Sequence, residues 1–134
     1  MKKLDRFISK RRLLAKNYDE LLLDCKGIRP TQLLSRNSSA HHIYVIRIDF
    51  TSTVTSRNQL MTDLRKIGIG SQVHYRPIPT QPFYQNLGLS ERTVPHAMEY
   101  YSECLSIPLY PRLSKRNQRQ IIRCLKDLVI GQEK

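Results

Sequence analysis

The sequence predicts one small α+β domain, in which a mainly antiparallel sheet of short strands carries helices on one face. Two observations support this prediction. Apolar residues recur with the 3.6-residue period of a helix at both ends of the chain and with the two-residue period of a strand between them. At 134 residues the chain also has the usual size of a domain with one core. A sheet of so few strands leaves its second face open unless another domain or subunit covers it.

The first predicted element is a long amphipathic helix. Arg11 is the one interruption in its apolar stripe, which consists of Leu4, Phe7, Ile8, Leu14, Ala15, Tyr18, Leu21 and Leu22. Gly27 and Pro30 are expected to end the helix, because glycine favours the left-handed terminal turn and proline cannot continue a helix. A helix of this length in so small a domain indicates a connection to another part of a protein.

A polar connector over 31–40 and a strand over 43–50 are expected to follow. Residues of the strand alternate between two faces, as the pleat of a β-strand requires. The face predicted to be buried carries Tyr44, Ile46, Ile48 and Phe50.

A second helix is expected over 57–67. Ser56 and Gln59 form a capping box, in which the serine hydroxyl accepts from the amide of Gln59 and the glutamine side chain reaches back. Gly68 is expected to end this helix, and a second strand is expected over 69–75. The side chains predicted to face the core are Leu60, Met61, Leu64 and Ile67.

The segment 76–95 is predicted to form a loop without regular helix or sheet, because it contains Pro77, Pro79 and Pro82. A loop of this length in a small domain is usually functional or packed against a partner. A short helix then presents Ala97, Tyr100, Tyr101 and Cys104 on one face. A brief strand over 105–107 and a final helix over 115–129, capped by Ser114, complete the chain. The last helix is expected to bury Ile121, Ile122, Leu125, Leu128 and Val129.

The net charge of +12 is the strongest signal in the composition. Seven of the 23 basic residues lie between Lys2 and Lys16, and six more lie between Arg112 and Lys126. Such a charge suggests nucleic acid, an anionic ligand or an acidic partner surface. Both stretches are also amphipathic helices, so a solvated polar face explains them equally well. No aromatic ladder accompanies the charge, which weakens the case for nucleic acid.

The sequence contains few of the motifs that are typical of catalytic sites. It has no glycine-rich phosphate loop, nucleophile elbow or paired carboxylates, so it does not predict a self-sufficient enzyme. His41 and His42 have no third ligand at a recognisable spacing, so no metal site is expected. The three cysteines are expected to be reduced, in a cytoplasmic protein. No apolar stretch is long enough for a membrane span, and the basic N-terminus does not have the pattern of a signal peptide.

The segment His74-Tyr75-Arg76-Pro77 is the candidate binding site. It lies where a predicted strand enters the proline-rich loop, a position from which side chains can face a cleft. The arginine suits a phosphate or carboxylate, and His74 and Tyr75 suit hydroxyl groups. A hydrogen-bonded strand end without a ligand is the alternative.

Several segments of the chain follow one another in an order found in a known enzyme family. They are Arg11-Arg12 with Tyr18 and Leu21-Leu22, His42-Ile43-Tyr44-Val45, Leu64-Arg65-Lys66-Ile67-Gly68-Ile69, His74-Tyr75-Arg76-Pro77-Ile78, Gln81-Pro82-Phe83-Tyr84, and Leu105-Ser106-Ile107-Pro108-Leu109-Tyr110-Pro111 with Ser114. This order resembles the carboxy-terminal part of the DegT/DnrJ/StrS family of sugar-nucleotide aminotransferases, which use pyridoxal phosphate. Within that family, His41-His42 and the run from Gly68 to Tyr75 resemble enzymes that aminate UDP-4-keto-6-deoxy-N-acetylhexosamines for pilin, flagellin or surface-polysaccharide glycosylation.

The resemblance implies a connecting helix over 1–26 and the small domain of a fold-type I pyridoxal-phosphate aminotransferase over 27–134. In the family, a larger amino-terminal domain carries the Schiff-base lysine and most phosphate-binding groups. That domain has no counterpart in this sequence. The chain alone is therefore expected to be inactive, with no catalytic residue and no cofactor or metal site. The intact enzyme is expected to bind pyridoxal phosphate, to form a homodimer, and to use a nucleotide sugar and an amino-acid amino donor, without a membrane or a specific nucleic acid.

The resemblance also implies roles for individual residues. His74 and Tyr75 match the family's His-Tyr pair at the edge of the substrate cleft, and Arg76 follows in many members. Pro79 departs from the pattern, because many relatives have a second histidine there. Two other interpretations of the chain remain open at this point. One is a free-standing basic module that binds nucleic acid, and the other is a regulatory or scaffold protein that keeps the fold without the chemistry.

Overall fold

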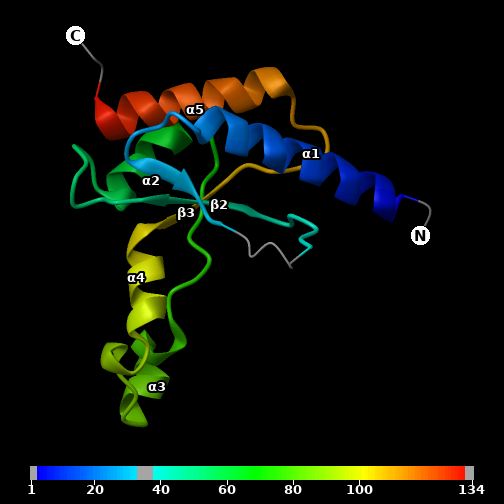
Figure 1. Ribbon diagram of the computed structural model, residues 1–134. Coiled ribbons are helices and arrows are strands. Elements are labelled where there is room, and N and C mark those ends of the chain that lie inside the picture. The colour runs from blue at the N-terminus through cyan, green and yellow to red at the C-terminus, as the bar shows by residue number, and fades with distance from the viewer. Residues whose placement is uncertain (1–2, 33–37, 132–134) are drawn as a thin grey trace.

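The computed structural model describes residues 3–32 and 38–131. Its centre is an antiparallel sheet of three strands in the order β1-β2-β3, with bounds Ile28–Pro30, Tyr44–Ile48 and Cys104–Ile107. The helices α1, α2 and α5 span Leu4–Leu22, Arg57–Lys66 and Lys115–Ile130. They lie together on one side of the sheet, whereas α4 (Pro95–Glu103) and α3 (Pro82–Asn86) extend from the other side (Figure 1). The predicted α+β class with an antiparallel sheet is confirmed.

The middle strand, β2, organises the sheet. It pairs on one side with β1, where Ile28 lies opposite Ile48, and on the other with β3, where Tyr44 lies opposite Ile107. Its burial alternates along the strand, with Tyr44, Ile46 and Ile48 inward, as the period of two predicted. Phe50 lies beyond the strand and is only partly buried.

The expected strand over 69–75 is wrong. Only Gln72 pairs, in an isolated bridge with Ser106 of β3. The chain leaves α2 through a tight turn, in which the amides of Gly68 and Ile69 donate to the carbonyls of Arg65 and Leu64 at 3.0 and 2.9 Å. Gly68 has the positive φ of 79° that such a turn requires. These hydrogen bonds occupy the start of the segment, so it cannot pair there with β3.

The third strand is instead β1, in the segment where the sequence predicted only the end of the first helix. Three residues are too few to show a period of two, so the pattern could not indicate a strand. Pro30 ends this strand at the edge of the sheet, where the missing proline N–H is tolerated. The predicted connector over 31–40 lies partly outside the described residues, because these exclude 33–37.

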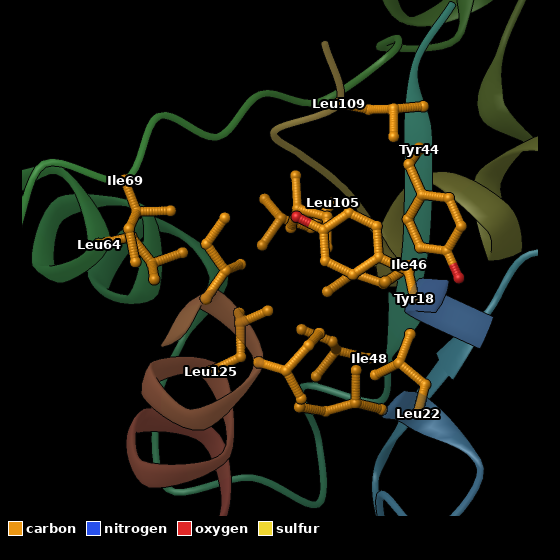
Figure 2. Close-up of a cluster of buried hydrophobic side chains, with 14 of the residues drawn as sticks. Tyr18, Leu22, Tyr44, Ile46, Ile48, Leu64, Ile69, Leu105, Leu109 and Leu125 are labelled. Atoms are coloured by element: carbon orange, nitrogen blue, oxygen red, sulfur yellow. The ribbon is translucent and has the colours of Figure 1, made fainter. Parts of the chain in front are cut away.

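The hydrophobic core lies between the sheet and the three helices α1, α2 and α5 (Figure 2). The sheet and all three helices contribute side chains that are almost fully excluded from water, among them Tyr18, Leu22, Ile46, Ile48, Leu60, Leu64, Leu105, Leu125 and Val129. Leu4 and Phe7, predicted to be buried on α1, are 49% and 40% exposed, because the first turns of the helix extend past the sheet. Ile67 is also exposed, since it follows the last turn of α2.

One polar residue of α5 was not predicted in the core. Gln118 is fully buried, and its side chain joins the first and last helices. Its Nε2 donates to the carbonyl of Leu14 at 2.9 Å, and its Oε1 accepts from Nδ2 of Asn17 at 2.9 Å. Because both ends of the amide are satisfied, its burial does not carry the penalty of an unpaired polar group.

The helix caps agree in part with the sequence. Ser56 accepts from the amide of Gln59 at 3.3 Å, and Ser114 accepts from the amide of Asn117 at 3.1 Å. The reciprocal half of the capping box does not form, because the Gln59 side chain donates to Asp63 at 2.8 Å instead of reaching back. Both helices therefore begin at the predicted serines.

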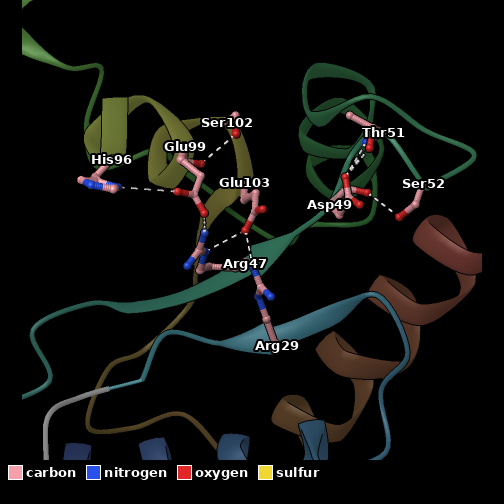
Figure 3. Close-up of polar contacts among 9 residues, drawn as sticks. All are labelled: Arg29, Arg47, Asp49, Thr51, Ser52, His96, Glu99, Ser102 and Glu103. Atoms are coloured by element: carbon pink, nitrogen blue, oxygen red, sulfur yellow. Dashed lines mark hydrogen bonds and ion pairs between the residues drawn. The ribbon is translucent and has the colours of Figure 1, made fainter. Parts of the chain in front are cut away.

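The predicted short helix is α4, and it partly covers the second face of the sheet, a position that the sequence did not indicate. Glu103 accepts from Arg29 of β1 and from Arg47 of β2, both at 2.7 Å, and Glu99 lies 3.4 Å from Arg47 (Figure 3). The side chain of Glu103 is only 19% exposed, so this ion-pair network is more strongly coupled than one in open solvent. The charges fix the position of α4, although none of its residues is buried.

The proline-rich segment 76–95 is more regular than expected. Pro82 begins the short helix α3 rather than preventing it, because its missing N–H is not needed in the first turn. Two 3-10 turns, Ile78–Thr80 and Glu91–Thr93, flank it. The segment is nevertheless poorly packed, since Ile78, Phe83 and Leu87 are 56%, 68% and 64% exposed.

We expect the domain to lose stability in alkaline solution through its buried tyrosines. Burial, together with the hydrogen bond to Asp19 at 2.5 Å, raises the pKa of Tyr44 above its ordinary value of 10.0. The unfolded chain ionises near the ordinary value, so the stability that neutral Tyr44 supplies is complete below about pH 10 and is lost above it. Denaturant unfolding from about pH 8 to 11 should show a shallower decline for Tyr44→Phe than for the unmodified chain. Equal declines would contradict this assignment.

Candidate functional site

An open cleft of about 670 Å³ lies beside the outer edge of β3. One wall is the segment that follows α2, from Ile67 to His74, and the opposite wall comes from the start of α5. Residues 106–110, the end of β3 and the turn after it, form the floor. The tight turn at Gly68 and the bridge between Gln72 and Ser106 hold the first wall in place.

His74 lines this cleft, as the sequence predicted for a side chain at this position. Its Nδ1 lies 2.7 Å from Oγ of Ser106, a buried residue of β3. The peptide bond to Tyr75 is cis, and the two rings meet edge to face with centroids 4.7 Å apart. His74 is therefore partly buried and fixed in orientation, with the cleft beside it.

Tyr75 and Arg76 do not line the cleft with His74. The ring of Tyr75 is 76% exposed. Arg76 turns back onto the first 3-10 turn, where its guanidinium donates to Oγ1 and to the carbonyl of Thr80 at 2.7 and 2.9 Å. The sequence placed the three side chains together because they are adjacent, but the backbone turns after His74 and sends them in different directions.

Other polar residues of the cleft were missed by sequence reasoning. They come from separate parts of the chain and are His42, Arg65, Ser71, Gln72, Ser106, Tyr110, Asn117 and Gln120. All of these except Asn117 and Gln120 lie in segments that resemble the known family, so those two alone carried no usable signal. Most of these groups are neutral donors and acceptors, which suits a ligand rich in hydroxyl or carbonyl oxygens.

His41 and His42 line two different clefts. His42 lines the cleft described above and lies 3.4 Å from Nη1 of Arg11. His41 has a left-handed φ of 47° and lines a second cleft that contains Asp19. Burial lowers the pKa of His41. In residues 3–32 and 38–131, no group of three or more His, Cys, Asp or Glu side chains could hold a metal ion.

The cleft does not fit pyridoxal phosphate as a covalently bound cofactor. None of the described residues that line it is a lysine, so no Schiff base can form there. None is an aspartate or glutamate that could pair with a pyridinium nitrogen. The nearest lysine along the chain, Lys66, is 67% exposed and bound to Asp63 at 2.8 Å. Arg65 is the one fixed cation of the lining.

Ten of the 23 basic residues lie on α1 and α5, which pack against each other. Arg12 of α1 donates to the carbonyl of Ser39 at 2.9 Å and to the hydroxyl of Ser38 at 2.7 Å. Across the described part of the chain, no ion pair involves a residue of either helix. No described helix is long and apolar enough to cross a membrane.

The sequence of the chain is similar to those of known aminotransferases. The family model described as the DegT/DnrJ/EryC1/StrS aminotransferase family matches residues 1–126. The chain is 31% identical to the spore coat polysaccharide biosynthesis protein SpsC of Bacillus subtilis over 133 residues, which cover 98% of the chain and 34% of that protein. It is 24% identical to a UDP-4-amino-4-deoxy-L-arabinose–oxoglutarate aminotransferase of Shewanella sediminis, covering 96% of the chain and 35% of that protein.

Solved structures show the same fold. Spr1654 of Streptococcus pneumoniae, a provisionally assigned sugar aminotransferase solved in PMP, apo and PLP forms, superposes with a TM-score of 0.84 at 26% identity, over 95% of this chain and 32% of that one. PseC of Helicobacter pylori, an aminotransferase of pseudoaminic acid biosynthesis, superposes with a TM-score of 0.81 at 28% identity, over 95% and 34%. The chain thus spans about a third of the length of the relatives it matches. These similarities give no support to nucleic-acid binding.

Proposed function

Because the chain belongs to the DegT/DnrJ/EryC1/StrS aminotransferase family, we propose that it forms the small, substrate-contacting domain of a pyridoxal-phosphate-dependent sugar aminotransferase. In this proposal the segment 1–26, which contains α1, is the connection to the rest of the enzyme, and residues 27–134 belong to the small domain. The observation that carries the proposal is the cleft beside β3, where His74 is held at 2.7 Å from Ser106 among neutral hydrogen-bonding groups. That arrangement can bind and orient an oxygen-rich ligand, but it has no lysine with which to transfer an amino group.

The proposed substrate is a 4-keto-6-deoxy nucleotide sugar, destined for pilin, flagellin or surface-polysaccharide glycosylation. Two relatives support this class. SpsC acts in spore coat polysaccharide biosynthesis, and PseC acts in pseudoaminic acid biosynthesis. Asn117, Gln120 and His42 offer donors and acceptors for sugar hydroxyls within one cleft. Arg65 at the rim is the group suited to a phosphate.

Pyridoxal phosphate, when bound, would supply an electron sink for moving an amino group between carbonyl compounds. We propose that a segment outside this chain supplies the lysine that holds it, together with an amino-acid donor site and the mate of a homodimer. The poorly packed apolar side chains Ile78, Phe83 and Leu87 are the surface proposed to lie against that segment or mate.

Within the substrate site, His74 is proposed to contact the sugar directly. Tyr75 is proposed to contact it from outside the cleft, since its exposed ring lies edge to face against that of His74. Arg76 could reach a ligand only by exchanging its two hydrogen bonds to Thr80, so we propose that it chiefly holds the turn beside the site.

A chimera tests this function. The chain would replace the aligned third of SpsC, and the product would be assayed with pyridoxal phosphate, L-glutamate and a UDP-4-keto-6-deoxy-N-acetylhexosamine. Formation of the 4-amino sugar is the expected result. A chimera that binds the cofactor and still leaves every 4-keto nucleotide sugar unchanged would overturn the proposed substrate class.

The purified chain alone should not form an internal aldimine with pyridoxal phosphate. The reason is that no described residue of the cleft is a lysine, so cofactor can react only with surface amines, weakly and without selectivity. Absorbance spectra before and after borohydride treatment, followed by peptide mapping, measure this. One lysine labelled stoichiometrically would contradict the prediction.

A further inference from the structure

Ser106 is distinctive because each of its polar groups is bonded to the segment that carries His74. It lies in β3 and is 5% exposed. Its amide donates to the carbonyl of Gln72 at 2.7 Å, and its carbonyl accepts from the amide of Gln72 at 3.1 Å. Its Oγ lies 2.7 Å from Nδ1 of His74. One buried residue therefore fixes both the backbone near His74 and one nitrogen of its ring.

The direction of the Ser106–His74 hydrogen bond decides which ring nitrogen carries the proton. A serine hydroxyl has one hydrogen to donate, and a neutral imidazole has one donor and one acceptor nitrogen. Among the described residues, Nδ1 of His74 is the one recorded partner of this hydroxyl. If Nδ1 carried the proton, the hydroxyl hydrogen would have no acceptor among the described residues, which is unfavourable for a buried group. The favoured arrangement has the hydroxyl donating to Nδ1 and the ring proton on Nε2.

We propose that Ser106 is a positioning residue that holds His74 as the Nε2–H tautomer, so that this ring donates a hydrogen bond to a ligand oxygen in the cleft. The identity of that oxygen as a sugar carbonyl or hydroxyl rests on the proposed function, whereas the tautomer does not. With Nδ1 engaged by Ser106, neutral His74 offers the ligand a donor and no free acceptor. The site therefore discriminates in favour of a ligand oxygen and against an N–H group at this position.

The tautomer can be measured on the chain as it stands. Long-range proton–nitrogen correlation spectra of ¹⁵N-histidine-labelled protein at about pH 8, where an ordinary imidazole is neutral, distinguish the two tautomers. The chain has four histidines, so His74→Gln assigns the signals. The expected result is a protonated Nε2 and an unprotonated, hydrogen-bonded Nδ1 for His74. A proton on Nδ1 in the unmodified chain would overturn the proposal.

Two variants of Ser106 show whether the serine causes the preference. Ser106→Ala should leave His74 as a mixture of tautomers, and Ser106→Thr, which keeps a hydroxyl, should restore the single form. The dispersion of backbone amide signals verifies that each variant is folded, and if either is not, the spectrum of the unmodified chain decides alone. His42→Gln is the matched control and should leave the His74 signals unchanged. An unaltered tautomer in folded Ser106→Ala would show that another group sets it.

A kinetic measurement separates this inference from the proposed function. In the SpsC chimera, Ser106→Ala is expected to lower kcat/KM about tenfold, mainly through KM, and Ser106→Thr is expected to recover it. If Ser106→Ala abolishes the tautomer preference of His74 but leaves kcat/KM unchanged, the proposed contact of His74 with the ligand is wrong. The assignment of the tautomer still stands in that case. Unchanged tautomer with lost activity would overturn the positioning role of Ser106.

Discussion

His74→Ala is expected to lower kcat/KM about 100-fold in an enzyme that contains this chain, such as the SpsC chimera, which corresponds to about 2.7 kcal/mol of transition-state stabilisation. The reason is that the imidazole is held at 2.7 Å from Ser106 with the cleft beside it, so its removal leaves the ligand without an oriented donor. Stability should fall by no more than about 1 kcal/mol, because the variant loses one hydrogen bond of a partly buried side chain. Steady-state kinetics and thermal unfolding measure the two effects.

His96→Ala is the matched control for this experiment. The side chain of His96 is 99% exposed on α4, and its contact to Glu99 is long, at 3.9 Å, so both activity and stability should remain unchanged. The opposite pattern for His74→Ala, with activity kept and the fold lost, would identify His74 as a structural residue of the strand edge.

Leu105→Ala is expected to reduce the free energy of unfolding by about 3 to 5 kcal/mol. Leu105 is fully buried in β3, opposite Ile46 of the central strand, and it faces the core that α2 and α5 close (Figure 2). Truncation leaves a cavity that the sheet cannot fill by shifting, since Gln72 pairs with β3 on one side and Ile46 pairs with it on the other. Because small domains are stable by only about 5 to 15 kcal/mol, the loss should be visible as a large shift in denaturant midpoint.

Leu23→Ala is the control for that variant. Leu23 has the same side chain but is 80% exposed just after α1, so its truncation should change stability by less than about 0.5 kcal/mol. Equal losses for the two variants would show that Leu105 does not lie in the described core.

The fold was predictable wherever the period of apolar residues extended over enough of the chain. The alternation at Tyr44, Ile46 and Ile48 and the helical stripes of α2 and α5 gave the correct elements, and Ser56 and Ser114 gave the correct starts. The strand β1 is too short to carry a period, and the segment after Gly68 was mistaken for a strand because local alternation says nothing of the turn that precedes it. The ion pairs that place α4 join Arg29 and Arg47 to Glu103, and such long-range partners have no local signature.

Only one of the three candidate site residues lines the cleft, and the binding role of all three stays a prediction. His74 lies in the cleft, but the direction of Tyr75 and Arg76 depends on the backbone beyond it and on Thr80. The remaining lining residues come together only when α5 packs beside the segment after α2, so no spacing along the chain indicates them. The start of the proline-rich segment already indicated a cleft beside His74, and the family resemblance added that this cleft would bind a substrate.

The hydrogen bonds of the Gln118 side chain have a consequence for folding during synthesis on the ribosome. The partners of this side chain, Asn17 and Leu14, are made about a hundred residues earlier, at sequence separations of 101 and 104. Part of the apolar stripe of α1 can be covered soon after synthesis by β1 and Tyr44, but the part that faces α5 stays exposed until the last helix follows. Since contacts so distant in sequence form late, the docking of α1 is complete only after α5 has been made. We therefore expect nascent chains that end before α5 to be the ones that chaperones bind.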